Sequence, residues 1–330
     1  MYYQKYAQQF SNYLTQLVGK KVAVIGHLRP DGDCIGSQIA LVRILNSLGI
    51  NAIALNKDKV PESLQFFVKD TPFAHANFID YKDYIPITVD ASDTTRIGDE
   101  LKNLFPNIKL NIDHHLSNIN FAETNIVDSH VAATSELLAG IFLDLNIKID
   151  PITAEALYLG IATDTGQFRY GMTNAQVFSI CTQLINLGAS PPLTAHQLYE
   201  RESFGRILLL KEFLGTLKLE LGGKLCIGTI NEAMFKATGT NKEHTESLVD
   251  YPRSIDTVIV AAVLEERPDN VIKGSLRAKN DAVRVDLLAQ HFSGGGHASA
   301  AGFSFQMNLQ EFYPLFIQTV KSHLSNLNLL

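Results

Sequence analysis

The chain contains no tryptophan, only three cysteines and no apolar run close to the roughly 20 residues that a membrane-spanning helix needs. The cysteines (Cys34, Cys181 and Cys226) lie far apart and form no Cys-x-x-Cys pair, so neither a disulfide framework nor a zinc ribbon is expected. Residues 1–18 have the pattern of a polar amphipathic helix without the apolar core of a signal peptide. We therefore expect a cytoplasmic protein with no membrane partner.

An excess of positive charge is also missing. Lysine and arginine total 28 against 34 aspartates and glutamates, a formal net charge of −6. Proteins that bind long nucleic acid through its phosphates usually carry a basic surface. A nucleic-acid ligand of this chain is therefore expected to be short, or held at one end in a local basic pocket. With 330 residues, of which 46% are hydrophobic and 19% charged, the chain is a globular protein large enough for two domains.

Residues 21–49 predict the first half of a βαβ unit, with a β-branched apolar run, a loop and then apolar residues at helical spacing. The loop carries His27, Asp31 and Asp33. Each has an ordinary local use, because Pro-Asp-Gly favours a turn and an aspartate can cap the following helix. Three metal-ligand side chains within seven residues also begin a metal site at the carboxyl end of a strand.

Two further apolar strands end in the same way. Residues 84–89 lead to Asp90, and residues 108–112 lead to Asp113, His114 and His115. The carboxyl ends of parallel strands lie on one edge of a sheet, so these side chains are expected to face the first loop across one cleft. Local structure alone does not explain three strands that end this way, although Asp113 could orient a histidine instead of binding metal.

Beyond residue 120 the pattern becomes helical, with helices predicted over 131–145, 151–168 and 174–187. Asp164 lies near the end of the second, where a carboxylate opposes the helix dipole, so a compensating cation is an obvious partner. The apolar faces of 131–145 and 174–187 suit either the core or a homodimer.

The fold class is therefore α/β with two domains. We expect a parallel-sheet catalytic domain over 1–190, a helical linker over 191–221 and a smaller α/β domain over 222–330. Strands of the smaller domain are predicted at 225–230, 257–264 and 271–278, and its helices near 231–237, 245–253, 285–292 and 309–324.

The second domain contains a run of three glycines and a histidine: Gly294, Gly295, Gly296 and His297. Consecutive glycines allow close backbone approach to a ligand, and their N–H groups can surround an anion. A turn between helix and strand is the plainer alternative. Arg277 and Lys279, on a neighbouring predicted strand, favour a phosphate pocket. The run matches neither the Walker loop nor the dinucleotide fingerprint.

Taken in order, these motifs resemble the DHH phosphoesterase family, named for the triplet seen here at residues 113–115. The glycine-rich run looks like the signature of that family's associated C-terminal domain. The resemblance spans about residues 21–305. Length and architecture place the chain with the stand-alone nanoRNase and pAp-phosphatase group, rather than with RecJ-type exonucleases, membrane-bound cyclic-dinucleotide phosphodiesterases or family-II pyrophosphatases.

The resemblance implies two divalent metal ions bridged by Asp90, with His115 facing the scissile phosphate and Asp113 orienting the histidines. It assigns one ion to His27, Asp31 and Asp90 and the other to Asp33, Asp90, His114 and Asp164. A donor set of carboxylates and imidazoles without thiolate favours Mn²⁺, with Mg²⁺, Co²⁺, Fe²⁺ and Zn²⁺ as alternatives. Cys34 adjoins these residues, but no basic neighbour in the sequence activates it as a nucleophile.

The implied substrates are short 5′-phosphorylated RNA, 3′-phosphoadenosine 5′-phosphate (pAp) and pApA. The second domain would hold the 5′-phosphate through Arg277, Lys279, His297 and the glycine amides, with Arg96 as a further contact or a surface ion-pair residue. Alternative functions are a pApA or cyclic-dinucleotide phosphodiesterase, an inorganic pyrophosphatase and a non-catalytic nucleotide-binding module.

Overall fold

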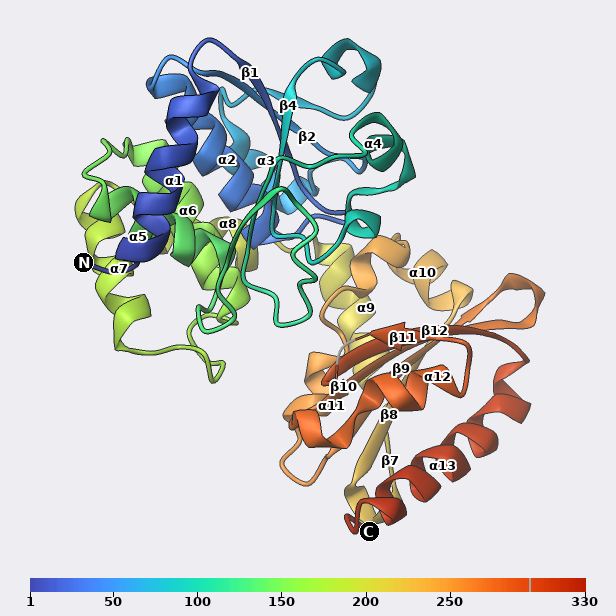
Figure 1. The fold of residues 1–330 in the computed structure, drawn as a ribbon. Coiled ribbons are helices and arrows are strands. Elements are labelled where there is room, and N and C mark those ends of the chain that lie inside the picture. Colours follow the sequence, from blue (N-terminus) through green and yellow to red (C-terminus); the bar gives the residue numbers. More distant parts are fainter. Residues whose placement is uncertain (297) are drawn as a thin grey trace. The chain divides into compact units, whose positions relative to one another are not determined.

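The computed structural model describes residues 1–296 and 298–330. The chain forms two compact units, Met1–Arg201 and Glu202–Leu330, each with its own sheet (Figure 1). The predicted two-domain α/β class is confirmed. The division falls inside the segment predicted as a linker, and this segment holds two helices. Helix α8 (Pro191–Tyr199) belongs to the first unit and α9 (Phe204–Leu214) to the second.

The first unit is built on a six-stranded parallel sheet in the order β3-β2-β1-β4-β5-β6. The chain starts at the centre, runs outward to β3 and then returns to the other side of β1. Parallel sheets of this kind bind ligands where the strand order reverses, which here is between β1 and β4. The strands are β1 (Lys21–Ile25), β2 (Asn51–Leu55), β3 (Phe73–Ala74), β4 (Ile85–Val89), β5 (Leu110–Asp113) and β6 (Thr124–Val127).

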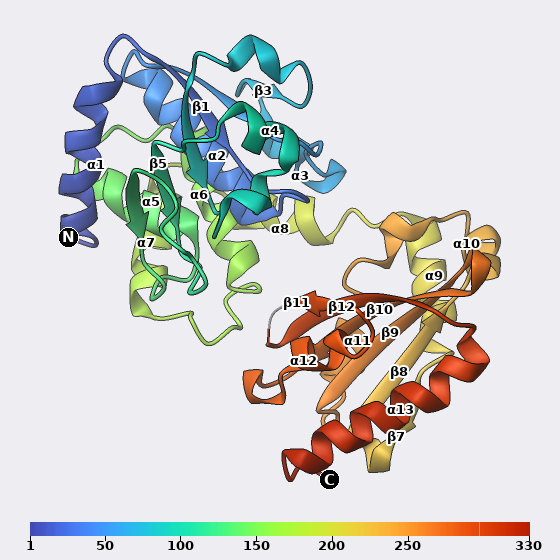
Figure 2. The same cartoon turned by 45° about the vertical axis from the view of Figure 1, so that its right-hand side comes forward.

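Both faces of this sheet are covered, which explains why its central strands are apolar throughout. In β1, Val22 and Val24 pack into the core on one face, while Ala23 and Ile25 pack into the core on the other. Figure 2 shows the two layers. The first consists of α1 (Gln4–Leu17), α2 (Gly32–Ser47), α5 (Thr134–Asp144), α6 (Pro151–Asp164) and α7 (Ala175–Asn186), and the second of η1 (Phe78–Tyr81), η2 (Thr94–Ile97) and α4 (Asp99–Leu104).

Helices α2 and α6 pack closely and carry two of the predicted ligands into place. Helix α2 begins where Asp31 caps it, and Asp33 lies in its first turn. Helix α6 begins with Pro151, which suits the first helical position, and Asp164 is its last residue. The short helix α3 (Glu62–Val68) contacts α2, α6 and α8.

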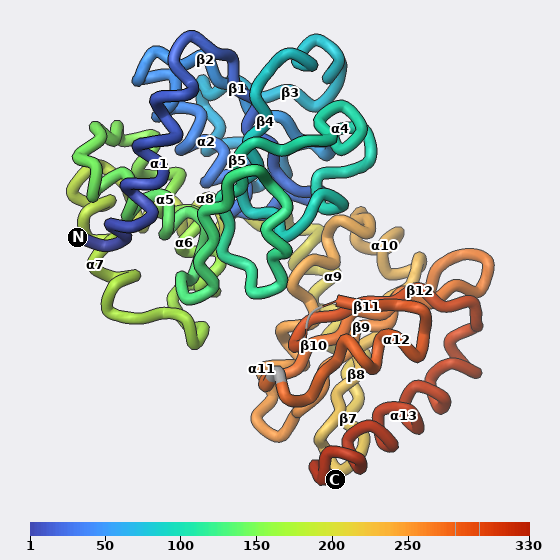
Figure 3. The backbone as a smooth tube through the Cα atoms, viewed as in Figure 1, coloured from blue at the N-terminus to red at the C-terminus, as the bar shows by residue number. Residues whose placement is uncertain are grey.

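The second unit has a mixed six-stranded sheet in the order β11-β12-β10-β9-β8-β7, in which only β8 and β9 run parallel. Its strands are β7 (Lys218–Glu220), β8 (Leu225–Ile230), β9 (Val260–Arg267), β10 (Val271–Ala278), β11 (Gly295–Gly296) and β12 (Ala300–Gln306). One face packs against α12 (Val285–Gln290) and α13 (Leu309–Asn326), and the other against α9, α10 (Glu232–Thr238) and α11 (Asp250–Ser254), as Figure 3 traces. Short 3-10 turns complete the unit: η3 (Leu221–Gly223), η4 (Lys242–Thr245), η5 (Pro268–Asn270) and η6 (Asp281–Val283).

Several predicted elements are wrong in detail. The chain beyond residue 120 is not purely helical, because β6 adds an edge strand before α5. The strand predicted at 257–264 lies three residues later, as β9. The helix predicted near 245–253 shortens to α11 after η4. In the described residues, no helix combines the length and the apolar character that a membrane crossing requires.

Candidate metal centre

The ends of β1, β4 and β5, the first turn of α2 and the last residue of α6 bring together eight of the predicted site residues at the point where the strand order reverses. Each of the eight has a ring nitrogen or carboxylate oxygen within 4.0 Å of another member of the group. They are His27, Asp31, Asp33, Asp90, Asp113, His114, His115 and Asp164. The three adjacent strands thus gather side chains that lie far apart in the sequence.

His27 and Asp90 form the centre of one half of this cluster. Nε2 of His27 lies 3.4 Å from Oδ2 of Asp90 and 3.7 Å from Oδ1 of Asp31. Nδ1 of the same ring faces the carbonyl oxygen of Leu28 at 2.8 Å, which leaves Nε2 to serve as a ligand. His27 and Asp90 are almost fully buried, whereas the side chain of Asp31 is more than half exposed.

The other half is arranged around His114. Its Nε2 lies 3.1 Å from Oδ2 of Asp164, 3.6 Å from Oδ1 of Asp90 and 3.9 Å from Oδ2 of Asp33. The two oxygens of Asp90 therefore face two different histidines, His27 and His114. This is the placement that a carboxylate bridging two cations requires.

Asp90 adopts a left-handed backbone conformation, with φ of 57°. This conformation costs a residue other than glycine about 1–2 kcal/mol, and such strain is often found at functional sites. Because β4 ends immediately before it, the turn aims the carboxylate across the sheet edge, where its Oδ1 also accepts a hydrogen bond from the Thr134 hydroxyl at 3.1 Å.

Asp113 contacts a histidine rather than the rest of the acidic cluster. Its Oδ1 lies 2.7 Å from Nδ1 of His115, and its Oδ2 accepts a hydrogen bond from the Asn118 amide at 2.5 Å. With Nδ1 donating to Asp113, His115 keeps its Nε2 for a ligand or substrate. Nδ1 of His115 also lies 3.7 Å from Oδ1 of Asp90.

The groups that hold Asp33 were not predicted from the sequence. The backbone N–H groups of Thr134 and Ser135, at the start of α5, donate to its two carboxylate oxygens at 2.7 and 2.8 Å. The turn is fixed in its place by Glu136, which accepts hydrogen bonds from the N–H of Ala132 and the hydroxyl of Tyr3, both at 2.6 Å. No local signal reveals these contacts, because they join segments about 100 residues apart.

The electrostatics of the cluster favour a cation. Burial, together with the charges of Asp90 and Asp164, raises the pKa of Asp33 well above its usual value. Burial also raises the pKa of Asp164 to about 6, against the hydrogen bond from His114. Buried carboxylates of like charge destabilise one another unless positive charge balances them. The donor set of carboxylate oxygens and imidazole nitrogens fits divalent metal ions.

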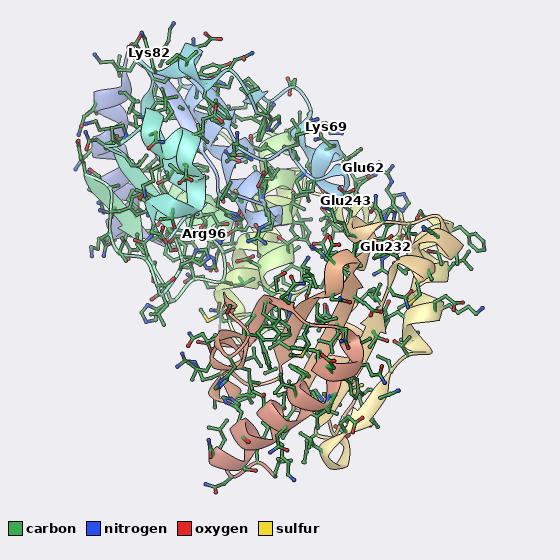
Figure 4. The ribbon with its side chains drawn as sticks, turned by 90° about the vertical axis from the view of Figure 1, so that its right-hand side faces the viewer. Glu62, Lys69, Lys82, Arg96, Glu232 and Glu243 are labelled. Atoms are coloured by element: carbon green, nitrogen blue, oxygen red, sulfur yellow. The ribbon has the colours of Figure 1, made fainter. Side chains whose placement is uncertain are left out.

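The residues predicted to bind substrate do not form one cluster, because they are divided between the two units. Arg96 lies in η2 of the first unit, where Figure 4 labels it, and its carbonyl accepts from the N–H of Leu28 in the His27 loop at 2.7 Å. In the second unit, Arg277 is near the end of β10, opposite Ala300 of β12. The ammonium of Lys279 donates to the backbone carbonyls of Ile255 and Asp256 at 2.6 and 3.0 Å.

The glycine run is more ordered than a loop. Gly295 and Gly296 form β11, which pairs with Gly302 and Ala301 of β12. The N–H of Gly294 donates to the carbonyl of Ala289 at 2.9 Å. A Cβ at Gly294 would lie 2.2 Å from the carbonyl oxygen of Gly302, so only glycine fits there. The predicted role of His297 falls outside the described residues.

Fold and site together define the class: a two-unit α/β protein whose parallel sheet gathers five aspartates and three histidines where the strand order reverses. Residues 21–161 match the DHH family, N-terminal domain, and residues 222–326 match the DHHA1 domain. The chain belongs to the DHH family, as its motifs predicted.

The chain is similar over most of its length to curated and solved relatives. It is 27% identical over 312 residues to the bifunctional oligoribonuclease and PAP phosphatase NrnA of Thermus thermophilus, covering 92% of this chain and 90% of that protein. It is 24% identical to the cyclic-di-AMP phosphodiesterase PdeA of Listeria monocytogenes, covering 89% of this chain and 46% of the relative. An exopolyphosphatase-related protein from Bacteroides fragilis shares the fold with a TM-score of 0.90 at 25% identity, covering 98% of both chains.

A structure of the exonuclease RecJ bound to manganese shares the fold more distantly. Its TM-score is 0.54 at 15% identity, covering 98% of this chain and 94% of that chain.

Proposed function

We propose that this protein is a metal-dependent phosphoesterase that cleaves short 5′-phosphorylated RNA to 5′-mononucleotides and also converts pAp to AMP. The observation that carries the proposal is the position of Asp90, whose two oxygens face His27 and His114. Support comes from the family and from the relative named bifunctional oligoribonuclease and PAP phosphatase, which matches nearly the whole chain.

Two divalent cations would be held by the side chains of the cluster, with Mn²⁺ as the first candidate. His27, Asp31 and Asp90 would hold one, and Asp33, Asp90, His114 and Asp164 the other. When bound, such ions supply Lewis acidity, which lowers the pKa of water and offsets the charge that develops on phosphoryl oxygens. The family neighbour with manganese is consistent with this choice of ion.

The side chains around the ions would divide the remaining work. The hydrogen bond from Nδ1 of His115 to Asp113 fixes the ring and leaves Nε2 to donate to a phosphoryl oxygen or to the leaving oxygen. Asn118 holds the far oxygen of Asp113, so the carboxylate cannot rotate away. Thr134 and Ser135 keep Asp33 in a single orientation.

The second unit would bind the 5′-phosphate of the substrate. Arg277 offers a guanidinium on β10, which β12 separates from the glycine strand β11, and the absence of side chains in β11 admits an anion close to the backbone. Such a pocket would explain how one enzyme accepts both RNA ends and pAp, because both present a 5′-nucleotide with a phosphate linked to its 3′-oxygen. The roles of Arg96, Gly294 and His297 belong to the same proposal. The contacts of Lys279 with two backbone carbonyls favour a structural role for that residue.

The test is a time course with Mn²⁺ in which pAp, pApA, a 5′-phosphorylated RNA pentamer and pyrophosphate are offered separately, with EDTA controls. Metal-dependent release of AMP from pAp, and of mononucleotides from the pentamer, supports the proposal. Turnover of pyrophosphate alone would instead favour a pyrophosphatase. No turnover despite bound metal would favour a nucleotide-binding module.

A cyclic-dinucleotide phosphodiesterase is the second candidate, because PdeA matches across 89% of this chain. Cyclic-di-AMP added to the same assay distinguishes the two, since the preferred function predicts much faster cleavage of pApA and short RNA. We place the activity in the cytoplasm. A homodimer through the exposed Phe178 and Ile185 of α7 is part of the same proposal, and light scattering would test it.

A further inference from the structure

One thiol lies in the half of the cluster that contains His27. Sγ of Cys34, a ring nitrogen of His27 and a carboxylate oxygen of Asp90 all lie within 4.8 Å of one another. The backbone N–H of His27 also donates to this sulfur at 3.3 Å. Cys34 is fully buried. The donor set predicted from the sequence contains no thiolate, and this geometry adds a sulfur donor to it.

The fold keeps this sulfur where it is. Cys34 lies in the first turn of α2, and its N–H donates to Oδ1 of the capping Asp31 at 3.1 Å. On the other side, a Cβ added to Gly26 would lie 2.6 Å from the sulfur, so the thiol packs directly against the backbone after β1. The sulfur is thus held between the start of α2 and the backbone after β1, which preorganises it as a ligand.

The other two cysteines provide an internal comparison. Cys181 packs in the apolar core of the first unit, and Cys226 packs beneath α9 in the second. Among the described residues, neither joins a group of side chains that could hold a metal ion. Burial of a cysteine in this chain therefore does not by itself place sulfur beside imidazole and carboxylate donors.

We propose that Cys34 is an additional ligand that makes the His27–Asp90 position selective for thiophilic divalent cations such as Zn²⁺, Cd²⁺ and Co²⁺. The inference rests on the proposed metal centre. The donors would be one imidazole nitrogen, one thiolate sulfur and the carboxylate oxygens of Asp31 and Asp90, a set that favours Zn²⁺ over Mn²⁺ or Mg²⁺. Binding breaks the S–H bond, forms a sulfur–metal bond and releases the proton to solvent.

The position of His114 offers no sulfur within this distance among the described residues, only imidazole and carboxylate donors. The two halves of the cluster therefore differ in the softness of their donor atoms, because only the half that contains His27 includes a sulfur. A mixture of Mn²⁺ and Zn²⁺ should fill them unequally, with Zn²⁺ concentrated beside Cys34. Such a site would make the activity respond to the ratio of the two ions.

The direct test is optical. Co²⁺ is titrated into the metal-free protein, and the near-ultraviolet band that arises from charge transfer between thiolate and Co²⁺ is recorded. We expect the band in the wild type and in Cys181→Ala, and its loss in Cys34→Ala and Cys34→Ser. If Co²⁺ binds without the band, or if the band survives in a folded Cys34→Ala protein, the inference is wrong.

Two further measurements complement the optical test, and the first of them needs no variant. Cadmium-113 NMR of the unmodified protein should show one resonance shifted by sulfur ligation and one without it, and two resonances of oxygen and nitrogen type would refute the inference. Equilibrium dialysis with equal Zn²⁺ and Mn²⁺ should show a zinc preference that falls about tenfold or more in Cys34→Ser. If neither Mn²⁺ nor Co²⁺ binds and no nucleotide is cleaved, the proposed function itself has failed.

Discussion

Asp90 is the residue on which both halves of the cluster depend, because its two oxygens face two histidines. Asp90→Asn should preserve the fold, since asparagine tolerates the left-handed backbone conformation seen there. Activity should fall by roughly 10³-fold or more, because both cations lose a ligand worth several kcal/mol in the transition state. Metal analysis and kinetics check this, with the exposed Asp99→Asn as the matched control. Near-normal metal content and activity in Asp90→Asn would exclude a bridging role.

His115 is expected to act on the substrate and not to bind the cation. His115→Gln should therefore lower kcat by about 10²–10⁴-fold, the usual contribution of a general acid or base, while metal content and KM stay close to those of the wild type. Asp113→Asn should also lower kcat, because it removes the acceptor that fixes the ring. A loss of bound metal in His115→Gln, parallel to the loss of activity, would show that the ring is a ligand after all.

The protonation of the metal-free cluster gives a prediction about pH. Burial disfavours a charged His114, but Asp164, Asp90 and Asp33 outweigh it and raise the pKa of His114 from 6.5 to about 11. A raised pKa means that the folded state holds the proton more tightly than the unfolded state. The stabilising contribution is therefore complete below pH 6.5 and is lost as the pH rises toward 11.

Divalent metal must displace this proton, so the two effects have opposite signs. The Tm of the metal-free protein should fall between pH 6.5 and 9, while the increase in Tm on adding Mn²⁺ should grow over the same range. For each displaced proton, metal affinity should rise about tenfold per pH unit. Differential scanning fluorimetry with Mn²⁺ or EDTA measures both. A metal-induced Tm increase that does not change with pH would contradict the raised pKa.

At the scale of single residues, much of the cluster could be predicted. Acids and histidines follow three apolar strands, and parallel strands bring their carboxyl ends together. The backbone donors at Thr134 and Ser135 could not be predicted, because any residue type supplies an N–H and the contact depends on where α5 begins. The proximity of Cys34 to Asp90 was hidden for a similar reason, since it needs the packing of α2 against the end of β4.

At the scale of elements, the contact between helices α6 and α5 gives a prediction for Gly160. This glycine of α6 lies against the start of α5. A Cβ there would lie 2.1 Å from the hydroxyl of Ser135 and 2.7 Å from Oδ1 of Asp33. Gly160→Ala should therefore displace Asp33 and weaken metal binding by about tenfold or more. The overpacking should cost about 1–3 kcal/mol of stability, which exceeds the helix propensity that alanine adds.

Calorimetric metal titration and chemical denaturation measure the two effects of Gly160→Ala. Gly171→Ala is the matched control, because nothing lies within 4 Å of its new Cβ and its backbone is not left-handed. It should leave both quantities unchanged. Equal metal affinity in the two variants would mean that the packing of α6 against α5 does not position Asp33.

Helices and strands were predicted best where the apolar residues follow a single regular spacing in the sequence. Strands β8 and β10 begin and end at the predicted residues. The edge strand β6 was missed because its residues, Thr-Asn-Ile-Val, show little apolar pattern and are stabilised mainly by pairing with β5. The glycine strand β11 has no side chains to signal a strand at all, and only its pairing with β12 defines it.

For the whole molecule, an acidic chain must bind anionic substrates, so the few well-placed cations matter. Arg277 in β10 is the one we expect to recognise the 5′-phosphate. A hydrogen bond to a charged group is worth about 1.5–3 kcal/mol, so Arg277→Ala should raise KM for pApA by roughly 10- to 150-fold. Metal content should stay unchanged and kcat nearly so, because Arg277 and the metal cluster belong to different units.

The substrate pair pApA and ApA, which differ only in the 5′-phosphate, isolates this effect. The wild type should prefer pApA, and Arg277→Ala should lose that preference while its rate on ApA hardly changes. Lys279→Ala is the comparison variant, because its ammonium is bound to the carbonyls of Ile255 and Asp256 and its loss should lower stability rather than raise KM. If Arg277→Ala slowed cleavage of ApA as much as that of pApA, the arginine would act on the fold or on the reaction, and the 5′-phosphate would have to be recognised elsewhere in the chain.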